Sequence, residues 1–340
     1  MTVFQRTPVL ALPMRQETLD NDPAKQEEAR KEADDVFSTF RKTCDSFPLD
    51  FKATHNYPEL SAAEWEKRCN EQYEKGGFRL WVGSTADIFV NPESNRFVYD
   101  FWAEKTRARI QDAVKRDLLA PLEPPHPFGT KRVPLEEDYF EMTDRPTVHI
   151  VDVNVDPIAE FTPAGIVTES GKQFEFDVIA LATGYDMNPG VIKMGVKGID
   201  GVDIEERWKT GPSTFLGITV PGFPNMFISY STQTPAALHN APLFIELQVD
   251  WMRDMIHKLE EKGIRYVDTL PDASKAWYDE SQAIATATLF PKTKSYYNGA
   301  NIPGGKVEFK FYACPLPVYK QRCFDAIRDE DFAKSYQVCD

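Results

Sequence analysis

The chain has 340 residues and a formal net charge of −14, with 42% hydrophobic and 27% charged residues, proportions close to those of soluble globular proteins. The acidic balance argues against general nucleic-acid binding, which needs a basic surface. No apolar run is long enough for a membrane-spanning helix, and the N-terminus has no secretory apolar segment. We therefore expect a soluble, cytoplasmic protein of about two domains.

Cysteine and histidine spacing argues against a disulfide framework or a metal centre. The five cysteines form no C-x-x-C pair and leave one unmatched: Cys44, Cys69, Cys314, Cys323 and Cys339. They predict reduced thiols. Four histidines lie far apart, without metal-ligand spacing: His55, His126, His149 and His257. We interpret the fifth, His239, as a hydrogen-bonded loop residue and not as a catalytic base.

The chain opens on a short strand and then becomes helical. Residues 2–4 are β-prone, and because a domain rarely begins inside a core strand, the first methionine is an unexpected start. Asp22 can cap a helix and Pro23 fits its first position. This helix is expected to reach about Asp45, and its apolar stripe consists of Val36, Phe37 and Phe40.

Two more helices are predicted before a proline-rich connector. Ser61 and Glu64 form a capping box, and the helix they begin should stop at the two glycines 76–77. Another helix is expected over residues 94–119. It should bury residues at helical spacing: Phe97, Phe101, Trp102, Ile110 and Val114. Five prolines within residues 121–134 then predict an extended connector.

Strands are expected after the connector. We predict strands at residues 148–153, 158–161, 165–168 and 174–182, with a turn at Gly171. The run Val178 to Ala182 is apolar on both faces, as in a strand buried within a parallel sheet. Further on, residues 242–262 predict an amphipathic helix. Its apolar stripe is expected to contain Ile245, Val249, Met252, Ile256 and Leu259.

Three short motifs are candidates for ligand binding. Thr183-Gly184 ends the 174–182 segment, where a crevice opens at the carboxyl end of a parallel strand, although the glycine could simply permit a tight turn. Arg6 follows the first strand and can hold phosphate oxygens, or it can be an ordinary solvated arginine. Lys131-Arg132 lies within the connector, where a basic pair can also be plain surface.

Together these motifs resemble the C-terminal portion of the class B flavin monooxygenases, closest to the Baeyer–Villiger monooxygenases. The segments that carry the resemblance are VFQRTP, PFGTKRVP, FDVIALATGYD and SYYNGANIPG, which begin at residues 3, 127, 176 and 295. The resemblance covers essentially the whole chain. It implies an α/β fold that is part of a two-dinucleotide-binding-domain flavoprotein with a helical insertion.

The resemblance also implies a division of the chain. Residues 1–16 would end the NADP-binding domain, and residues 17–128 would form the helical insertion. Residues 129–176 would return to the NADP-binding domain. Residues 177–340 would form the C-terminal half of the FAD-binding domain.

The implied cofactors are FAD and NADPH. By this resemblance Arg6, Thr7 and Lys131 contact NADPH, with Arg6 and Lys131 at its 2′-phosphate. Arg132 is the implied catalytic residue and also reaches the flavin; a guanidinium that does not deprotonate would stabilise negative charge in the transition state. Thr183-Gly184 would lie beside the flavin.

Two segments depart from the family's pattern. Tyr296 stands where the family usually has Trp; its ring keeps a cofactor contact plausible but changes the shape of the pocket. Residues 231–242, STQTPAALHNAP, occupy the position of a loop that packs along the flavin and implies contacts by Asn240 and Ala241. This loop has lost its leading Gly-Pro. The changes make a bulky secondary metabolite as plausible a substrate as a simple cyclic ketone.

No G-x-G-x-x-G loop occurs in the chain. Relative to the family, we expect about 150–200 residues with the glycine-rich cofactor loops to be missing. One hypothesis is a monooxygenase that uses FAD, NADPH and O2 to insert oxygen next to a ketone, or to oxidise a soft heteroatom, and whose N-terminal half is missing or comes from another chain. The other is an inactive remnant or accessory protein. A flavin N-hydroxylase is a third, which the Lys-Arg pair argues against.

Overall fold

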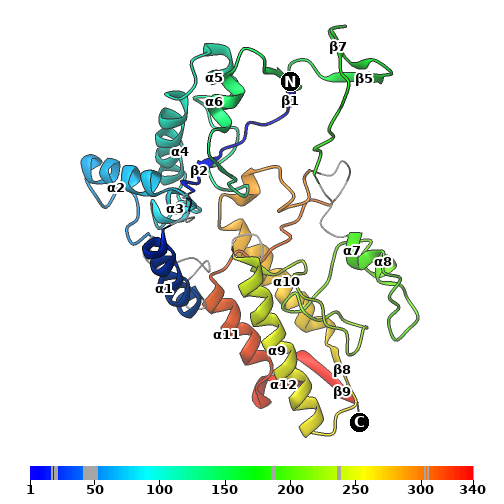
Figure 1. Cartoon of the computed structure of the whole chain (residues 1–340). Helices are drawn as coiled ribbons and strands as arrows, with labels where there is room; N and C mark the ends of the chain where they lie inside the picture. Colours follow the sequence, from blue (N-terminus) through cyan, green and yellow to red (C-terminus); the bar gives the residue numbers. More distant parts are fainter. Residues whose placement is uncertain are drawn as a thin grey trace. The chain divides into compact units, whose positions relative to one another are not determined.

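The structure is a computed structural model, and it describes residues 1–16, 18, 22–40, 53–184, 189–235, 239–301, 304 and 306–339. The chain divides into two compact units (Figure 1). The first unit comprises Met1–Glu17 and Lys52–Tyr185. The second comprises Thr18–Phe51 and Asp186–Asp340.

The first unit combines short strands with helices. Its strands are β1 (Thr2–Gln5), β2 (Leu12–Pro13), β3 (Leu135–Glu136), β4 (His149–Asp152), β5 (Ile158–Thr162), β6 (Gly165–Thr168) and β7 (Gln173–Glu175). Its helices are α2 (Ala62–Lys75), α3 (Arg79–Gly83), α4 (Pro92–Arg107), α5 (Ala113–Leu119) and α6 (Tyr139–Asp144). β1 pairs in parallel with β4 and β2 with β3, while β5, β6 and β7 form an antiparallel sheet.

Several local predictions for this unit are confirmed. The Ser61–Glu64 capping box begins α2, and Gly76 ends it. The connector at residues 121–134 contains no helix. The predicted strands at residues 148–153, 158–161 and 165–168 correspond to β4, β5 and β6. Mixed helices and strands with parallel pairs agree with the expected α/β class.

The single helix predicted over residues 94–119 is wrong, because the chain forms α4 and α5 with a break between them. Asp112 caps α5 by accepting the backbone N–H groups of Val114 and Lys115. The carboxylate of Asp144 accepts the N–H groups of Gln111 and Asp112, which fixes the break. As a consequence Val114, predicted to be buried, is 70% exposed.

The buried parallel strand predicted over residues 174–182 is also wrong. β7 ends at Glu175 and pairs antiparallel with β6, and residues 177–184 form no regular element. Val178 and Leu181 are 83% and 73% exposed. A strand that is apolar on both faces needs neighbouring strands and a cover on each face. The described residues supply neither for this segment.

Helix α4 holds together the segments that lead to the candidate site. The indole N–H of Trp102 donates to the carbonyl of Ala11 at 2.7 Å, just before β2. The amide of Asn95 donates to the carbonyl of Phe128 at 2.9 Å and accepts the N–H of Phe128 at 2.7 Å. Trp102 packs between Phe128 and Phe140, and all three rings are buried. The start of the chain and the connector are therefore anchored to one helix.

The second unit is mainly helical (Figure 1). Its helices are α1 (Pro23–Phe40), α7 (Pro189–Ile192), α8 (Ile204–Arg207), α9 (Ala241–Glu261), α10 (Pro271–Thr286), η3 (Phe290–Lys292), α11 (Leu316–Ala326) and α12 (Asp329–Ser335). β8 (Tyr266–Thr269) and β9 (Tyr336–Cys339) pair antiparallel. Asp22 caps α1 as predicted, by accepting the N–H groups of Ala24 and Lys25. The end expected near Asp45 and the side chains of Val36, Phe37 and Phe40 lie outside the described residues.

Helix α9 confirms the predicted helix at residues 242–262, but only Leu259 of the predicted stripe is buried. Val249 and Ile256 are 52% and 44% exposed. The buried side chains are Leu243, Phe244, Leu247, Gln248, Trp251, Met255 and Leu259. Trp251 explains this rotation, because its indole N–H donates to the carbonyl of Cys323 at 2.6 Å and its ring packs against Phe227. A buried, hydrogen-bonded indole outweighs two β-branched aliphatic side chains in deciding which face is covered.

No helix among the described residues is both long and apolar enough to cross a membrane.

Gly129 offers a test of how tightly the connector is packed. It has φ +76°, and a Cβ at this position would lie 2.2 Å from Nε1 of the buried Trp81. Gly77 has φ +63° and open space around it. We predict that Gly77→Ala lowers the free energy of unfolding by about 1 kcal/mol through backbone strain. Gly129→Ala should cost at least about 2 kcal/mol more because the methyl group also overpacks the site.

Urea unfolding of both variants, followed by tryptophan fluorescence, measures the two losses. Equal losses would show that the connector moves freely away from Trp81.

Candidate functional site

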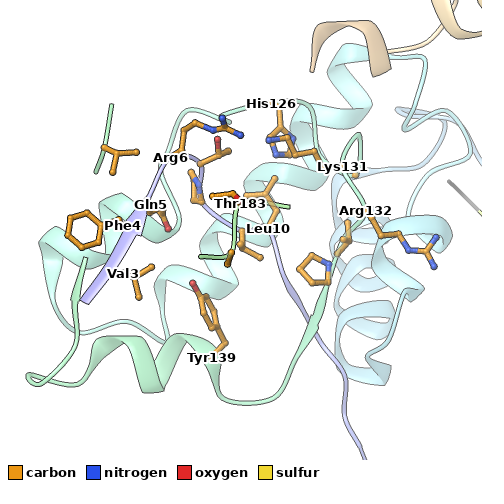
Figure 2. A pocket seen from close by; sticks show the side chains of 18 of the residues that line it. Val3, Phe4, Gln5, Arg6, Leu10, His126, Lys131, Arg132, Tyr139 and Thr183 are labelled. Carbon is orange, nitrogen blue, oxygen red and sulfur yellow. The ribbon is translucent and has the colours of Figure 1, made fainter. Parts of the chain in front are cut away.

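A cavity of about 590 Å³ lies in the first unit (Figure 2). It is bounded by the segment from β1 to Leu10, by the connector and by the exposed residues before Gly184. Five of the predicted residues line it: Arg6, Thr7, Lys131, Arg132 and Thr183. Gly184 follows Thr183 with φ +85°. The structure therefore brings together motifs that are separated by more than a hundred residues in the sequence.

Arg6 is placed by a pair of parallel strands. Gln5 of β1 lies beside Asp152 of β4, so the carboxyl ends of the two strands coincide and Arg6 follows directly. The carbonyl of Arg6 accepts the side-chain N–H of Asn154 at 2.6 Å, which ties the turn after β1 to the turn after β4. The carboxyl edge of parallel strands is where α/β proteins bind ligands. Arg6 itself is exposed and can reach a ligand.

Lys131 is placed by the anchored connector. Asn95 fixes Phe128, and Thr130 closes the next turn by donating its hydroxyl to the carbonyl of Pro127 at 2.7 Å. Burial lowers the pKa of Lys131, and the positive charge of Arg6 lowers it further. Two cations that repel each other in a partly buried site favour the entry of an anion.

Arg132 points in another direction. Its guanidinium lies over the rings of Phe78 and Trp81, with the carbon at 5.0 and 5.3 Å from the ring centroids. Figure 2 shows this side chain directed away from Arg6 and Lys131. Such cation–π contacts hold a guanidinium in place without neutralising its charge. Lys131 and Arg132 are thus adjacent in sequence, but Lys131 is affected by the charge of Arg6, whereas Arg132 packs against two aromatic rings.

The other predicted residues belong to the second unit. Asn240 is the N-cap residue of α9 and Ala241 is the first residue of that helix. Tyr296 packs edge-on against Tyr297 and Phe311, at centroid distances of 4.6 and 6.1 Å. Its ring is therefore part of an aromatic cluster and is half-buried.

His239 behaves as expected. It is buried, and its Nδ1 lies 2.7 Å from the carbonyl oxygen of Pro235. This contact confirms the prediction of a hydrogen-bonded loop histidine.

Two residues of the cavity were not singled out by the sequence. His126 lines the cavity and is 8% exposed. Tyr139, at the start of α6, lines it as well, and burial raises the pKa of its hydroxyl. The signal that could have found His126 is its place in PHPFGTKR, five residues before Lys131. Among the described residues, no group of three or more His, Cys, Asp or Glu side chains is arranged to hold a metal ion.

Comparison with known proteins gives a consistent result, although no family model matches the chain. The chain is 38% identical over 328 residues to the FAD-binding monooxygenase acrE of Aspergillus aculeatus, covering 96% of this chain and 55% of that protein. It is 37% identical over 320 residues to cyclopentanone 1,2-monooxygenase of a Comamonas species, covering 94% and 58%. The crystal structure of OTEMO in complex with FAD and NADP superposes with a TM-score of 0.88 at 29% identity, covering 99% of this chain and 62% of that one.

Fold and sequence thus place the chain among the flavin-dependent monooxygenases. More specifically, the chain belongs to the Baeyer–Villiger monooxygenases. It spans only about 55–62% of the length of the relatives and solved structures to which it was compared, which agrees with the C-terminal portion expected from the sequence.

The lowered pKa of Lys131 leads to a stability prediction. A lowered lysine pKa means that the folded state binds the proton more weakly than the unfolded state, so the charge destabilises the fold below about pH 10.4, the usual lysine value. We predict that Lys131→Met raises the melting temperature by about 1–2 °C at pH 7.5. The gain should shrink as the pH rises toward 10.5.

Lys67→Met, an exposed lysine on α2, is the matched control and should leave the melting temperature unchanged. Differential scanning fluorimetry between pH 7.5 and 10.5 measures both variants. A lower melting temperature for Lys131→Met at pH 7.5 would contradict the repulsion described above.

Proposed function

We propose that this chain supplies the NADPH-phosphate site and the catalytic arginine of a Baeyer–Villiger monooxygenase, which inserts one oxygen atom of O2 next to a ketone. The observation that carries the proposal is the convergence of Arg6, Thr7, Lys131 and Thr183 on one cavity beside Arg132. Cyclopentanone 1,2-monooxygenase is a relative named for a cyclic ketone, which supports the substrate class.

The residues present fit the phosphorylated end of NADPH. Arg6 offers a planar guanidinium that can bind two phosphate oxygens, and Lys131 offers a second cation. Thr7 is half-buried next to Arg6 and can donate a hydroxyl hydrogen bond. NADH lacks the 2′-phosphate, so it would not form these phosphate contacts. The OTEMO crystal structure contains NADP, which supports the same assignment.

Arg132 is proposed as the catalytic residue. Bound FAD, reduced by NADPH, would supply the oxygen chemistry. The part of Arg132 would be to place a permanent positive charge where negative charge develops in the transition state. Contact with Phe78 and Trp81 keeps the guanidinium oriented and partly shielded from water. Lysine would serve less well, since its pKa falls on burial.

Binding of FAD is proposed to need a region outside these 340 residues. Thr183-Gly184 and, in the second unit, Asn240, Ala241 and Tyr296 are the proposed flavin contacts. The chain has no G-x-G-x-x-G loop to hold the pyrophosphate. The exposed apolar residues Val178 and Leu181 fit a strand that pairs only when such a region is present, in the same protein or on another chain.

The family resemblance also supports a proposed division of the chain. Residues 1–16 and 129–176 would belong to the NADP-binding domain, residues 17–128 to the helical insertion, and residues 177–340 to the FAD-binding domain. The first unit contains all the residues that line the cavity, and it ends at Tyr185, close to the proposed boundary.

The role of Arg132 can be tested by co-expressing the chain with the remainder of cyclopentanone 1,2-monooxygenase. We predict that Arg132→Ala reduces product formation by at least about a hundredfold while FAD remains bound, because the charge acts on the transition state. Arg132→Lys should recover only part of the rate. Gas chromatography measures the lactone, and the visible spectrum measures the flavin. Full oxygenation by Arg132→Ala would overturn the assignment.

Arg6 is tested by cofactor preference. In the same co-expressed preparation, Arg6→Ala should raise the KM for NADPH about tenfold or more and leave the KM for NADH nearly unchanged, because only NADPH carries the 2′-phosphate. Arg328→Ala, an exposed arginine at the start of α12, is the control and should behave as the unaltered chain. An unchanged preference in Arg6→Ala would make Arg6 an ordinary surface residue.

A further inference from the structure

Besides Arg6, Lys131 and Arg132, the cavity contains a fourth basic side chain, which the proposed function does not use. His126 lines the cavity, is 8% exposed, and lies in the same connector as Lys131. Its Nδ1 lies 2.9 Å from the carbonyl oxygen of Pro127. Because a carbonyl oxygen only accepts, Nδ1 carries the hydrogen in this contact. The remaining ring nitrogen, Nε2, is the atom whose protonation can change.

Among the described residues, the charged side chains that line the cavity with His126 are all basic. Figure 2 shows Arg6, His126 and Lys131 gathered on one side of the cavity. The titratable groups that line the cavity with His126 are Lys131 and Arg132 from the connector, Arg6 from the turn after β1 and the Tyr139 hydroxyl from α6. Among the described residues lining the cavity there is no aspartate or glutamate. In a chain with a net charge of −14, such a basic lining is suited to an anion.

These surroundings disfavour the charged form of His126 when no anion is present. Burial lowers the pKa of His126, the contact with Pro127 opposes this effect in part, and the charge of Lys131 lowers the pKa further. An anion held between Arg6 and Lys131 would reverse the balance, because a nearby negative charge favours the protonated ring. A phosphate monoester at pH 7.5 is almost entirely a dianion, its second pKa being about 6.

We propose that His126 is a specificity-determining residue that takes up one proton from solvent at Nε2 when the 2′-phosphate of NADPH enters the cavity, and thereby strengthens the preference for NADPH over NADH. This inference rests on the proposed function of the cavity. It adds a pH dependence that Arg6 and Lys131 do not provide. A ribose without the phosphate brings no negative charge and leaves His126 neutral.

The test uses the full chain with adenosine 2′,5′-bisphosphate and adenosine 5′-monophosphate, two probes that differ only in the 2′-phosphate. Isothermal titration calorimetry at pH 7.5 in Tris and in HEPES gives the number of protons taken up on binding. We expect uptake of a substantial fraction of one proton with the bisphosphate and none with the monophosphate. The preference for the bisphosphate should rise as the pH falls from 8.5 to 6.5.

His126→Asn is the informative variant, because its amide can still donate to the carbonyl of Pro127 while Nε2 is lost. We expect it to bind adenosine 2′,5′-bisphosphate about tenfold more weakly at pH 6.5, without proton uptake, and to bind the monophosphate as before. His149→Asn, an exposed histidine of β4 outside the cavity, should match the unaltered chain. Melting temperatures check that each variant is folded.

The two possible failures are distinguishable. If folded His126→Asn keeps both the affinity for the bisphosphate and the proton uptake, the role of His126 is overturned while the proposed phosphate site stands. If the unaltered chain binds the two probes equally well, the proposed phosphate site fails, and the role of His126 fails with it.

Discussion

The candidate site depends on two side chains of helix α4, Asn95 and Trp102. Asn95 fixes the backbone of Phe128 through a donated and an accepted hydrogen bond, and Trp102 holds the carbonyl of Ala11. Both side chains are buried, so an unmet partner would cost about 1–3 kcal/mol. A helix of the predicted insertion thus fixes both segments that carry the cations. Arg6 is fixed in addition by the pairing of β1 with β4 and by Asn154.

The electrostatics of the cavity follow from this anchoring. The chain is acidic as a whole, yet the cavity gathers Arg6, Lys131 and His126 without a carboxylate among the described lining residues. Repulsion and burial lower the pKa of both Lys131 and His126. The site therefore stores an unfavourable charge arrangement that a phosphate would relieve. An unfavourable charge arrangement lowers the stability of the folded chain, and such a cost is common at ligand-binding sites.

Local signals were the most predictable part of the fold. Capping at Ser61 and Asp22, the proline-rich connector and the β5–β6 strands depend on neighbours in sequence, and the structure has them where the sequence indicates. The break between α4 and α5 depends on Asp144, which lies more than thirty residues away. The buried face of α9 depends on a hydrogen bond from Trp251 to Cys323. Neither partner can be identified from helical periodicity.

The same distinction applies to the candidate site. Family motifs pointed to Arg6, Lys131 and Thr183, and the structure brings these residues to one cavity. His126 was passed over because its importance comes from burial beside Lys131 and not from a spacing. Val178 to Ala182 read as a buried strand, yet they are exposed, because burial requires partners that the described residues do not provide.

We propose that this chain binds FAD, and so acts as a flavin monooxygenase, only together with a region that supplies the glycine-rich loops. The most direct test is the visible spectrum of the purified chain after incubation with FAD and desalting, alone and after co-expression with the remainder of cyclopentanone 1,2-monooxygenase. We predict a colourless chain alone and retained flavin absorbance in the co-expressed preparation. Flavin retained by the chain alone, or by neither preparation, would contradict it.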